Sequence, residues 1–546
     1  MSTLVTGKVH RQNVESENAM ERGIEGMMIA SELIRRGAVY FANEHAVRFG
    51  DTSLTFSEVY GYANRLANFL LHLGLQKGDR VAFLLANSAH SVAIDFAMIL
   101  SGLVRVPLNT RLSLRELDHM VRETEAKALI FSEDFTQQAD HLRQHVPTLR
   151  WPVLIEGMAN ADWMLAAQAE MVRYTDDEPS VKLSESDPVT IQYTSGTTGQ
   201  LKAAVHTQGT WSAITANILT AIRIDRGDIM LHAAPLTHAS GTLVLPHWIR
   251  GATNAILPGF KPAQFLEAVK RIRPTTLNLV PTMITMLLAH PNVADVSFAS
   301  VRQIIYGASP MPSETLKKAI SLWGHIFIQY YGQTECPLIL TVLDIYDHKR
   351  ALSDPQAEHI LLSCGRPTAV TELQILDEQG KPVPPGEIGE IAVRSTQQMI
   401  GYFQAPELTA DTIKDGWVHT RDMGYVDTDG YVYLVDRKSD MIISGGFNIY
   451  PREVEEVLYK HPAVLEAAVV GIPHDQWGEV GKAFVVLKEG QSATEEALIE
   501  HCRKYLAGYK RPHSIEFVDH LPKSAVGKVV RRLLREPYWA GRPRRI

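Results

Sequence analysis

The chain has few cysteines, no long hydrophobic run and no excess of positive charge. Its 546 residues include only Cys336, Cys364 and Cys502, which are widely spaced and form no C-x-x-C pair. A disulfide framework and a structural zinc site are therefore not expected, and a reducing compartment is favoured. The first residues contain no apolar core of signal-peptide length, and no stretch reaches about 18 uncharged apolar residues. We therefore expect a cytoplasmic protein without a transmembrane segment.

Charge and length narrow the class of protein further. The 54 basic and 61 acidic residues leave a net charge of −7, which argues against a nucleic-acid partner. A hydrophobic fraction of 45% is typical of a soluble globular protein. The length exceeds what one hydrophobic core normally serves, so two or more domains are expected.

Strand-like and helix-like segments alternate through the first 340 residues. Thr55-Phe-Ser-Glu58 and Ser113-Leu-Arg-Glu116 are capping boxes that open helices, and residues 80–86 and 127–131 resemble buried strands. This alternation predicts an α/β fold with mainly parallel, doubly wound sheets. Because ligands bind beyond the carboxyl ends of such strands, the loops after three further strands are expected to meet at one crevice; these strands are 229–233, 276–280 and 302–306.

The pattern changes in the last third of the chain. Residues 366–435 contain short strands and Gly/Pro turns, which indicate a small β-rich subdomain. Beyond the charged residues 436–440, helices and strands follow in an order that suits a small α+β domain. We predict an N-terminal domain over 1–435, a hinge at 436–440 and a C-terminal domain over 441–546.

The segment from Tyr193 to Thr207 has the chemistry of a phosphate-binding loop. A short apolar strand ends there in hydroxyls, glycines and Lys202, which together supply backbone N–H groups, hydroxyl donors and a mobile positive charge. Leu201 stands where a Walker A loop requires glycine, so the segment is not that motif. An ordinary turn remains the alternative for this stretch taken alone.

Three further segments carry polar groups that suit a nucleotide. Tyr330-Tyr-Gly-Gln-Thr-Glu335 offers an aromatic ring and a carboxylate for Mg²⁺, and Asp422 can accept hydrogen bonds from ribose hydroxyls. Lys528 follows a glycine and can neutralise developing negative charge. Each segment alone is equally compatible with a polar turn, an exposed aspartate or a solvated lysine.

Together and in this order, these segments resemble the acyl-adenylate-forming superfamily, in its acyl-CoA synthetase branch. Tyr193-Thr-Ser-Gly-Thr-Thr-Gly199 is similar to its phosphate loop, and Tyr330 to Glu335 to its adenine and magnesium motif. Thr420-Arg-Asp422 resembles the ribose motif, Asp436-Arg437 the hinge motif, and Lys528 the C-terminal catalytic lysine. The resemblance extends from about residue 30 to residue 535.

The resemblance implies an ATP-dependent acid:CoA ligase that uses ATP, Mg²⁺ and coenzyme A. A small-molecule carboxylic acid attacks the α-phosphate of ATP, giving acyl-AMP and pyrophosphate. The C-terminal domain then rotates, and the thiol of coenzyme A attacks the acyl carbonyl. A homodimer is left open.

The resemblance also assigns roles to individual residues. The catalytic residues would be Lys528, Thr334, which reaches the α-phosphate, Glu335, and His238 at the mouth of the acyl pocket. Thr198 and Glu335 would hold Mg²⁺. The nucleotide and coenzyme A would be bound by Thr194, Ser195, Gly196, Thr197, Thr198, Lys202, Gly307, Ala308, Ser309, Tyr331, Asp422, Arg437, Ser444, Gly445 and Gly446.

The chain departs from the family pattern at three places. Gly199-Gln-Leu-Lys-Ala203 lacks the usual proline and glycine of the phosphate loop. Arg421 stands where glycine is usual in the ribose motif, and Ser439 occupies the hinge position that is often Asp or Lys.

The residues of the predicted acyl pocket are mostly small or apolar, which favours a hydrophobic monocarboxylate: a medium-chain, alicyclic or aromatic acid. Its residues are His238, Ala239, Ser240, Gly241, Tyr306, Gly307, Gly332, Cys336 and Leu338. Gly307 and Gly332 are interpreted as making room for a ring or a chain.

Two other hypotheses remain. One is an acyl-AMP ligase that loads a carrier protein; the short segment after Lys528 and the lack of an insertion after residue 440 count against it. The other is a catalytically silent nucleotide-binding partner protein, which the presence of Glu335, Asp422 and Lys528 disfavours.

Overall fold

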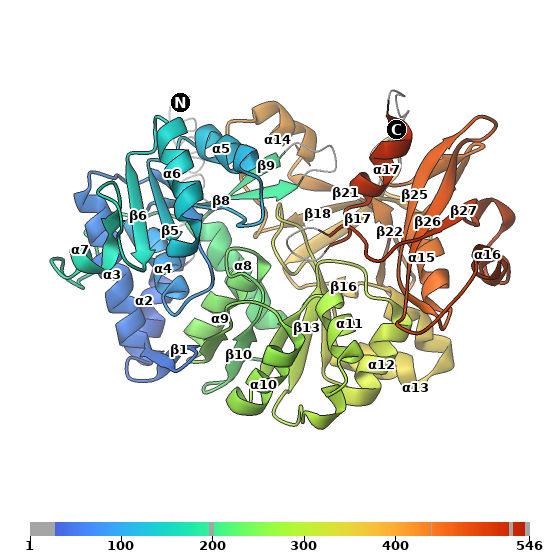
Figure 1. The fold of residues 1–546 in the computed structure, drawn as a ribbon, viewed down its shortest axis with the longest axis horizontal. Helices are drawn as coiled ribbons and strands as arrows, with labels where there is room; N and C mark the ends of the chain where they lie inside the picture. Colours follow the sequence, from blue (N-terminus) through green and yellow to red (C-terminus); the bar gives the residue numbers. More distant parts are fainter. Residues whose placement is uncertain (1–27, 196–200, 438, 524–527, 541–546) are drawn as a thin grey trace, which may run out of the picture.

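The computed structural model describes residues 28–195, 201–437, 439–523 and 528–540. An eight-stranded sheet occupies the upper left of Figure 1, in the order β19-β9-β8-β4-β3-β5-β6-β7. Its strands are β3 Arg80–Leu84, β4 Val104–Pro107, β5 Ala128–Ser132, β6 Trp151–Glu156, β7 Leu165–Ala166, β8 Pro188–Ser195, β9 Leu201–Thr207 and β19 Gly401–Tyr402. The strands from β8 to β7 run parallel, whereas β9 and β19 pair antiparallel at one edge.

A nine-stranded sheet lies below it in the order β16-β15-β14-β13-β12-β10-β11-β1-β2. Its strands are β1 His45–Phe49, β2 Thr52–Thr55, β10 Ile229–His232, β11 Thr253–Ile256, β12 Thr276–Leu279, β13 Gln303–Gly307, β14 Phe327–Tyr331, β15 Thr341–Leu343 and β16 Arg366–Pro367. Its central strands are parallel, which confirms the three predicted strands, and its outermost pairs are antiparallel.

Helices cover both faces of these sheets, as the alternating sequence pattern predicts. The helices are α2 Ala30–Tyr40, α3 Phe56–His72, α4 Ser91–Ser101, α5 Leu114–Glu123, α6 Thr136–His145, α7 Ala167–Met171, α8 Gln208–Ala221, α9 Val244–Ile249, α10 Pro262–Ile272, α11 Pro281–Ala289, α12 Ser313–Trp323 and α13 Ile345–Ser353. The capping boxes at Thr55 and Ser113 are confirmed. A third box, in which Thr207 caps α8, starts that helix three residues before the predicted Trp211.

Three apolar clusters hold the two large sheets in layers. One lies between the sheets and joins Phe83 of β3, Trp211 of α8 and Ile305 of β13. The second packs α5 and α6 on the outer face of the eight-stranded sheet, and the third packs α10, α11 and α12 on the outer face of the nine-stranded sheet. The carboxyl ends of the parallel strands are thereby fixed on rigid layers.

A five-stranded β subdomain follows. Its elements are β17 Thr371–Leu376, β18 Gly389–Ser395, α14 Pro406–Thr412, β20 Ile413–Lys414, β21 Trp417–Val426 and β22 Val432–Arg437. Asp422 lies inside β21 and pairs with Arg437 of β22. Asp422 therefore does not follow the end of a strand, because β21 continues past it through an irregularity in its pairing.

The C-terminal residues form a second five-stranded sheet with three helices, in orange and red in Figure 1. Its elements are β23 Ile442–Ser444, β24 Phe447–Ile449, α15 Pro451–Tyr459, β25 Val464–His474, β26 Gly478–Leu487, α16 Glu495–Arg503, β27 Ser514–Phe517 and α17 Arg531–Trp539. These elements form the small α+β domain that the sequence predicts for this region. Across the described ranges, none of the helices is both long and apolar enough to span a membrane.

Candidate active site

The antiparallel pair β8–β9 positions the phosphate-loop residues that the structure describes. Thr194 and Lys202 are register partners at the end of this hairpin, and both are half-buried. The Lys202 Nζ lies 5.6 Å from the centre of the Tyr402 ring. Burial and the positive charge of Arg421 lower the pKa of Lys202. The predicted contacts of Gly196, Thr197 and Thr198 and of the Ser195 side chain lie outside the described residues.

The predicted magnesium carboxylate, Glu335, is held by a tyrosine that sequence reasoning missed. The Tyr402 hydroxyl donates to Glu335 Oε1 at 2.7 Å, and the Met399 amide donates to the Glu335 carbonyl at 2.7 Å. Tyr402 reaches Glu335 because β19 pairs with β9, with Tyr402 opposite Ala204. Glu335 stays half-buried, so an oriented carboxylate faces the site, and carboxylate oxygens suit Mg²⁺ bound together with phosphates.

The predicted ribose carboxylate, Asp422, is buried and lies among three partners. Its Oδ2 accepts from the Tyr331 hydroxyl at 2.7 Å and from Gln333 Nε2 at 2.5 Å, and Arg437 Nε lies 3.1 Å from Oδ1. The structure thus brings the predicted residues Tyr331, Asp422 and Arg437 together and adds Gln333. The Tyr331 hydroxyl thereby orients the Asp422 carboxylate.

A buried histidine supports Thr334, the residue predicted to reach the α-phosphate. His206 of β9 donates from Nε2 to the Thr334 carbonyl at 2.8 Å. Burial lowers the pKa of His206 to about 4, so the ring is neutral at neutral pH. Nothing in the sequence around His206 marks it, because its partner lies 128 residues away.

Backbone approaches closely at Gly307 and Gly332, the two glycines interpreted as making room for a substrate. A Cβ on Gly307 would lie 2.3 Å from the Tyr330 carbonyl oxygen, and one on Gly332 would lie 2.4 Å from the Leu338 carbonyl oxygen. The close approach of neighbouring backbone therefore accounts for both glycines, and their predicted role in making room for a substrate stays a prediction. Gly241 likewise faces the Leu236 carbonyl oxygen. Ala308 and Ser309, predicted for the adenine slot, follow β13 and are half-buried.

His238 precedes the 3₁₀ helix Ala239–Leu243. Burial, with the nearby Arg105 charge, lowers the pKa of His238 to about 4, so this imidazole is neutral at neutral pH. Ser240, from the same predicted pocket, is buried and shares a 2.8 Å hydrogen bond with His232 Nδ1. The Ser240 hydroxyl is thus bound in the core.

Two other predicted pocket residues are core residues. Tyr306 is fully buried, and its hydroxyl lies 3.0 Å from Gln329 Oε1 and 2.8 Å from His348 Nε2. Cys336 is buried in the apolar cluster of the β subdomain. Both side chains are thus packed in the interior, and their predicted place in an acyl pocket stays a prediction. Leu338 does lie in the cluster between the two large sheets.

The structure brings Lys528 from the C-terminal domain to this group of residues. Desolvation by the surrounding protein, followed by the charge of Arg437, lowers the pKa of Lys528 to about 8, whereas the charges of Asp422 and Glu335 act in the opposite direction. Lys528 itself remains exposed to solvent, which moderates these effects. Lys528 is thus within electrostatic reach of both Asp422 and Glu335.

The helix that follows, α17, anchors this lysine. Arg531 Nη2 lies 2.7 Å from Glu455 Oε2 of α15, and Arg531 Nη1 lies 3.6 Å from carboxylate oxygens of Asp436 and Asp440. One arginine therefore joins the C-terminal helix, the C-terminal domain and the predicted hinge. Burial raises the pKa of Asp436 to about 6.

Family models match both parts of this site. The model described as "AMP-binding enzyme" matches residues 34–403, and the model described as "AMP-binding enzyme C-terminal domain" matches residues 453–528. The chain belongs to the AMP-binding enzyme family. The family resemblance inferred from the motifs is therefore confirmed.

Individual relatives of this AMP-binding enzyme are acid–thiol ligases. Feruloyl-CoA synthase of an Amycolatopsis species is 38% identical over 497 residues, which are 90% of this chain and 96% of that protein. Fatty acid–[acyl-carrier-protein] ligase ScoC of Streptomyces coeruleorubidus is 33% identical over 90% of this chain and 93% of that protein. The crystal structure of the anthranilate CoA ligase AuaEII with anthranoyl-AMP matches with a TM-score of 0.85 at 29% identity, covering 94% of this chain and 97% of that one.

The residues predicted to contact coenzyme A, Ser444 to Gly446, lie outside the cluster around Glu335 and Asp422 in this AMP-binding enzyme. Gly445 has a φ of +57°, and its amide donates to the Trp477 carbonyl at 2.8 Å. A Cβ on Gly445 would lie 2.7 Å from the Trp477 ring. The described contacts of Ser444 to Gly446 are thus with their own domain.

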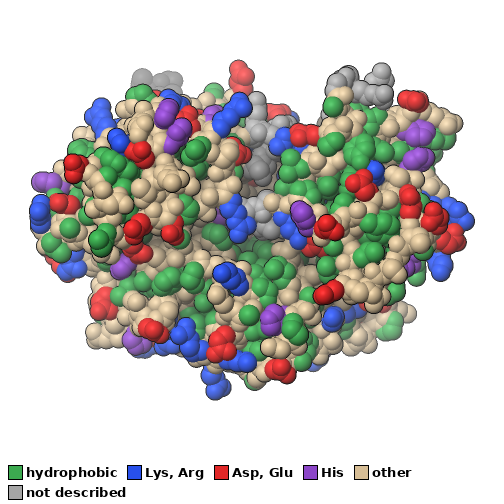
Figure 2. All heavy atoms as spheres, in the orientation of Figure 1, with side chains coloured by type: hydrophobic (Ala, Val, Ile, Leu, Met, Phe, Trp, Pro, Cys, Tyr) green, Lys and Arg blue, Asp and Glu red, His purple; other side chains and the backbone are tan. Residues whose placement is uncertain are grey.

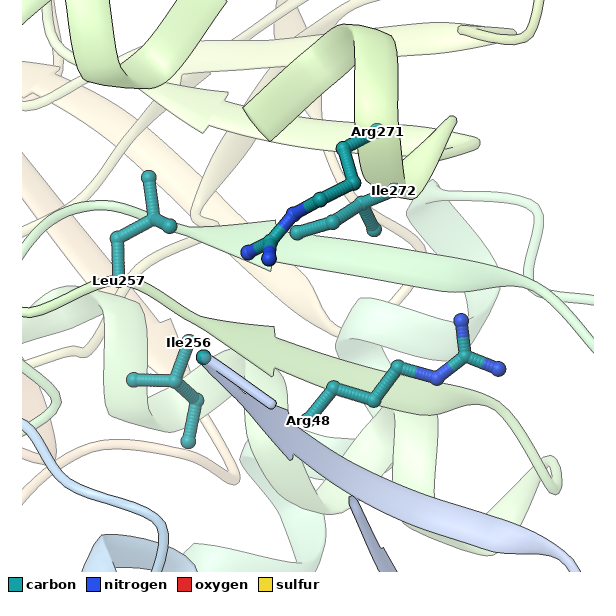
Figure 3. A pocket seen from close by; sticks show the side chains of 6 residues that line it. Arg48, Ile256, Leu257, Arg271 and Ile272 are labelled. Atoms are coloured by element: carbon teal, nitrogen blue, oxygen red, sulfur yellow. The ribbon is translucent and has the colours of Figure 1, made fainter. Parts of the chain in front are cut away.

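Figure 2 shows several Lys and Arg side chains near the middle of this face of the AMP-binding enzyme. A separate shallow pocket is lined by Arg48, Gly50, Ile256, Leu257, Arg271 and Ile272. The two guanidinium groups of that pocket point in opposite directions in Figure 3, and none of the predicted site residues lines it.

Proposed function

We propose that this AMP-binding enzyme is an ATP-dependent acid:CoA ligase. It forms acyl-AMP and pyrophosphate from a carboxylic acid and ATP, and then transfers the acyl group to coenzyme A with release of AMP. The observation that carries the proposal is the position of Lys528 within electrostatic reach of Glu335 and Asp422.

The charges of the site suit the first half-reaction. A carboxylate must approach a triphosphate, so the reaction brings negative charges together. Lys528, Lys202 and Arg437 supply positive charge around that point, while the buried Asp422 is oriented to accept from ribose hydroxyls. Mg²⁺ bound at Glu335 would offset further phosphate charge, and the Tyr402 hydrogen bond orients the carboxylate toward it.

The second half-reaction requires a different face of the C-terminal domain. Gly445 lies flat against Trp477, and the neighbouring Ser444 and Gly446 offer little side-chain bulk. We propose that rotation of the C-terminal domain replaces Lys528 with this strip, along which the pantetheine arm of coenzyme A passes. Rotation about the hinge at 436–440 would remove the lysine when a thiolate must attack.

We propose a hydrophobic monocarboxylate as substrate, with aromatic acids first. The Arg105 guanidinium near His238 is already paired with Asp95, so a second carboxylate on the substrate would gain little from it. His238 is neutral and adds no charge of its own. The similarity to proteins that act on ferulate and anthranilate supports an aromatic ring, and the fatty-acid ligase keeps medium-chain acids as second choice.

Pyrophosphate release tests the proposal. The enzyme is incubated with MgATP and, separately, benzoate, cinnamate, ferulate, cyclohexanecarboxylate and octanoate, with and without coenzyme A, and thioesters are identified by mass spectrometry. We expect turnover with an aromatic acid and a thioester only when coenzyme A is present. Failure of every acid to release pyrophosphate would contradict the ligase proposal.

The second candidate is a ligase that loads a carrier protein, which the similarity to ScoC favours. It differs from the first only in the thiol acceptor. After acyl-AMP has formed on the enzyme, coenzyme A and a phosphopantetheinylated carrier protein are added together at equal concentrations. The measurement is which of the two receives the acyl group. Acyl transfer to the carrier protein alone would show that the carrier protein, and not coenzyme A, is the acceptor.

A further inference from the structure

Arg421 holds a backbone conformation that disfavours its side chain. Its φ is +58°, in the left-handed region that glycine adopts freely. The position lies in β21 directly before Asp422, where its amide donates to Glu390 Oε1 at 3.1 Å. A residue other than glycine at such a strained position suggests that its side chain has a function.

The Arg421 side chain extends to α14, away from the partners of Asp422. It pairs with Asp411, which also lies 3.7 Å from Lys414 Nζ. The side chains of Arg421 and Asp411 are 45% and 55% exposed, so the pair adds little to stability. Burial alone would raise the pKa of Asp411, but the hydrogen bond and charge of Arg421 lower it.

Arg421 also lies at the phosphate end of the site. α14 packs against β19, and β19 carries Tyr402, whose ring lies beneath the Lys202 ammonium and whose hydroxyl holds Glu335. The charge of Arg421 acts on both Lys202 and Tyr402. Two cations are thus held within reach of each other beside the carboxylate that is predicted to bind Mg²⁺, an arrangement that suits a multiply charged anion.

We propose that Arg421 binds the terminal phosphates of MgATP and the pyrophosphate that leaves, exchanging its pairing with Asp411 for phosphate oxygens. The inference rests on the proposed function, because it takes the nucleotide to lie between Asp422 and Lys202. Asp411 then acts as a competitor for the guanidinium, and its charge weakens phosphate binding.

Two substitutions with opposite expected effects test this role. Arg421→Gly removes the cation and relieves the left-handed backbone, so the variant should be at least as heat-stable as the parent enzyme. Asp411→Asn keeps Arg421 and removes its competitor. Arg394→Ala is the matched control, because it breaks the exposed Arg394–Glu372 pair of the same sheet.

Calorimetric titration compares MgATP, pyrophosphate and AMP as ligands. We expect Arg421→Gly to weaken MgATP and pyrophosphate about tenfold, with AMP within about twofold. Asp411→Asn should tighten MgATP and pyrophosphate, and Arg394→Ala should change neither.

The outcomes separate this inference from the proposed function. Unchanged MgATP binding in Arg421→Gly, an equal loss of AMP binding, or weaker MgATP binding in Asp411→Asn would overturn the role of Arg421 and leave the ligase proposal standing. Failure of the parent enzyme to bind MgATP would overturn both.

Discussion

At the scale of single residues, the site depends on side chains that orient other side chains. Tyr331 and Gln333 hold Asp422, His206 holds the Thr334 backbone, and Tyr402 holds Glu335. The motifs predicted the carboxylates, since their chemistry is local. They did not predict His206 or Tyr402, because these reach the site through strand pairing between distant segments.

Tyr402→Phe removes one hydroxyl and keeps the ring beneath Lys202. A hydrogen bond to a charged group contributes about 1.5–3 kcal/mol, so we expect the Mg²⁺ concentration for half-maximal activity to rise about tenfold or more. The measurement is the rate of pyrophosphate release across a Mg²⁺ titration, and added Mg²⁺ should restore much of it. Tyr433→Phe is the control, because it also removes a hydrogen bond from a tyrosine hydroxyl to a carboxylate, but outside the site. An unchanged Mg²⁺ requirement would show that Tyr402 does not position Glu335.

The lowered pKa of Lys528, about 8, predicts an alkaline limit for adenylation. The protonated lysine offsets phosphate charge, so kcat/KM for ATP should fall as pH rises through about 8. His238 and His206, with pKa values of about 4, should add no inflection between pH 5 and 7. The pH profile of kcat/KM checks this, and Lys528→Arg should move the alkaline limb upward. A flat profile to pH 10 would contradict the assignment.

At the scale of elements, the helices and strands were largely predictable because their patterns are local. Capping boxes at Thr55 and Ser113 mark helix starts directly. The position of Asp422 inside β21 was not predictable, because the irregular pairing through which this strand continues has no local signal. The two-residue strand β19 is too short to show an alternation of apolar and polar residues in the sequence, yet it positions Tyr402 beside Glu335.

The contact of α17 with the hinge predicts a large effect of Arg531→Met. The change leaves Asp436, Asp440 and Glu455 without their shared cation, and removing one partner of a buried pair costs about 3–5 kcal/mol. We expect earlier thermal unfolding of the C-terminal domain and slower adenylation, since α17 positions Lys528.

The pH dependence of this loss identifies its cause. The pKa of Asp436 is already raised to about 6, so acid protonates the crowded carboxylates and the loss should be smaller at pH 5 than at pH 7.5. Arg532→Ala, in an exposed pair on the same helix, should change stability by about 0.5 kcal/mol or less. Equal destabilisation by both substitutions would show that Arg531 contributes no more to stability than an exposed arginine of the same helix.

At the scale of the whole molecule, the C-terminal domain brings Lys528 to the residues around Glu335 and Asp422, which is the arrangement that the proposed adenylation requires. The charges of Glu335 and Asp422 act on Lys528, and the Ser313 backbone at the start of α12 hydrogen-bonds to Glu456 of α15, so the two domains also touch away from the site. The sequence motifs named the members of this arrangement. Their spatial convergence depends on packing between segments far apart in the chain, which no local pattern carries.

The most direct test of the account separates the two half-reactions in Lys528→Ala. Pyrophosphate release is measured from acid and MgATP, and thioester formation is measured from chemically prepared acyl-AMP and coenzyme A. We expect adenylation to fall by about a hundredfold or more, while thioester formation from acyl-AMP stays near the parent rate. Unimpaired adenylation, or equal loss of both half-reactions, would contradict it.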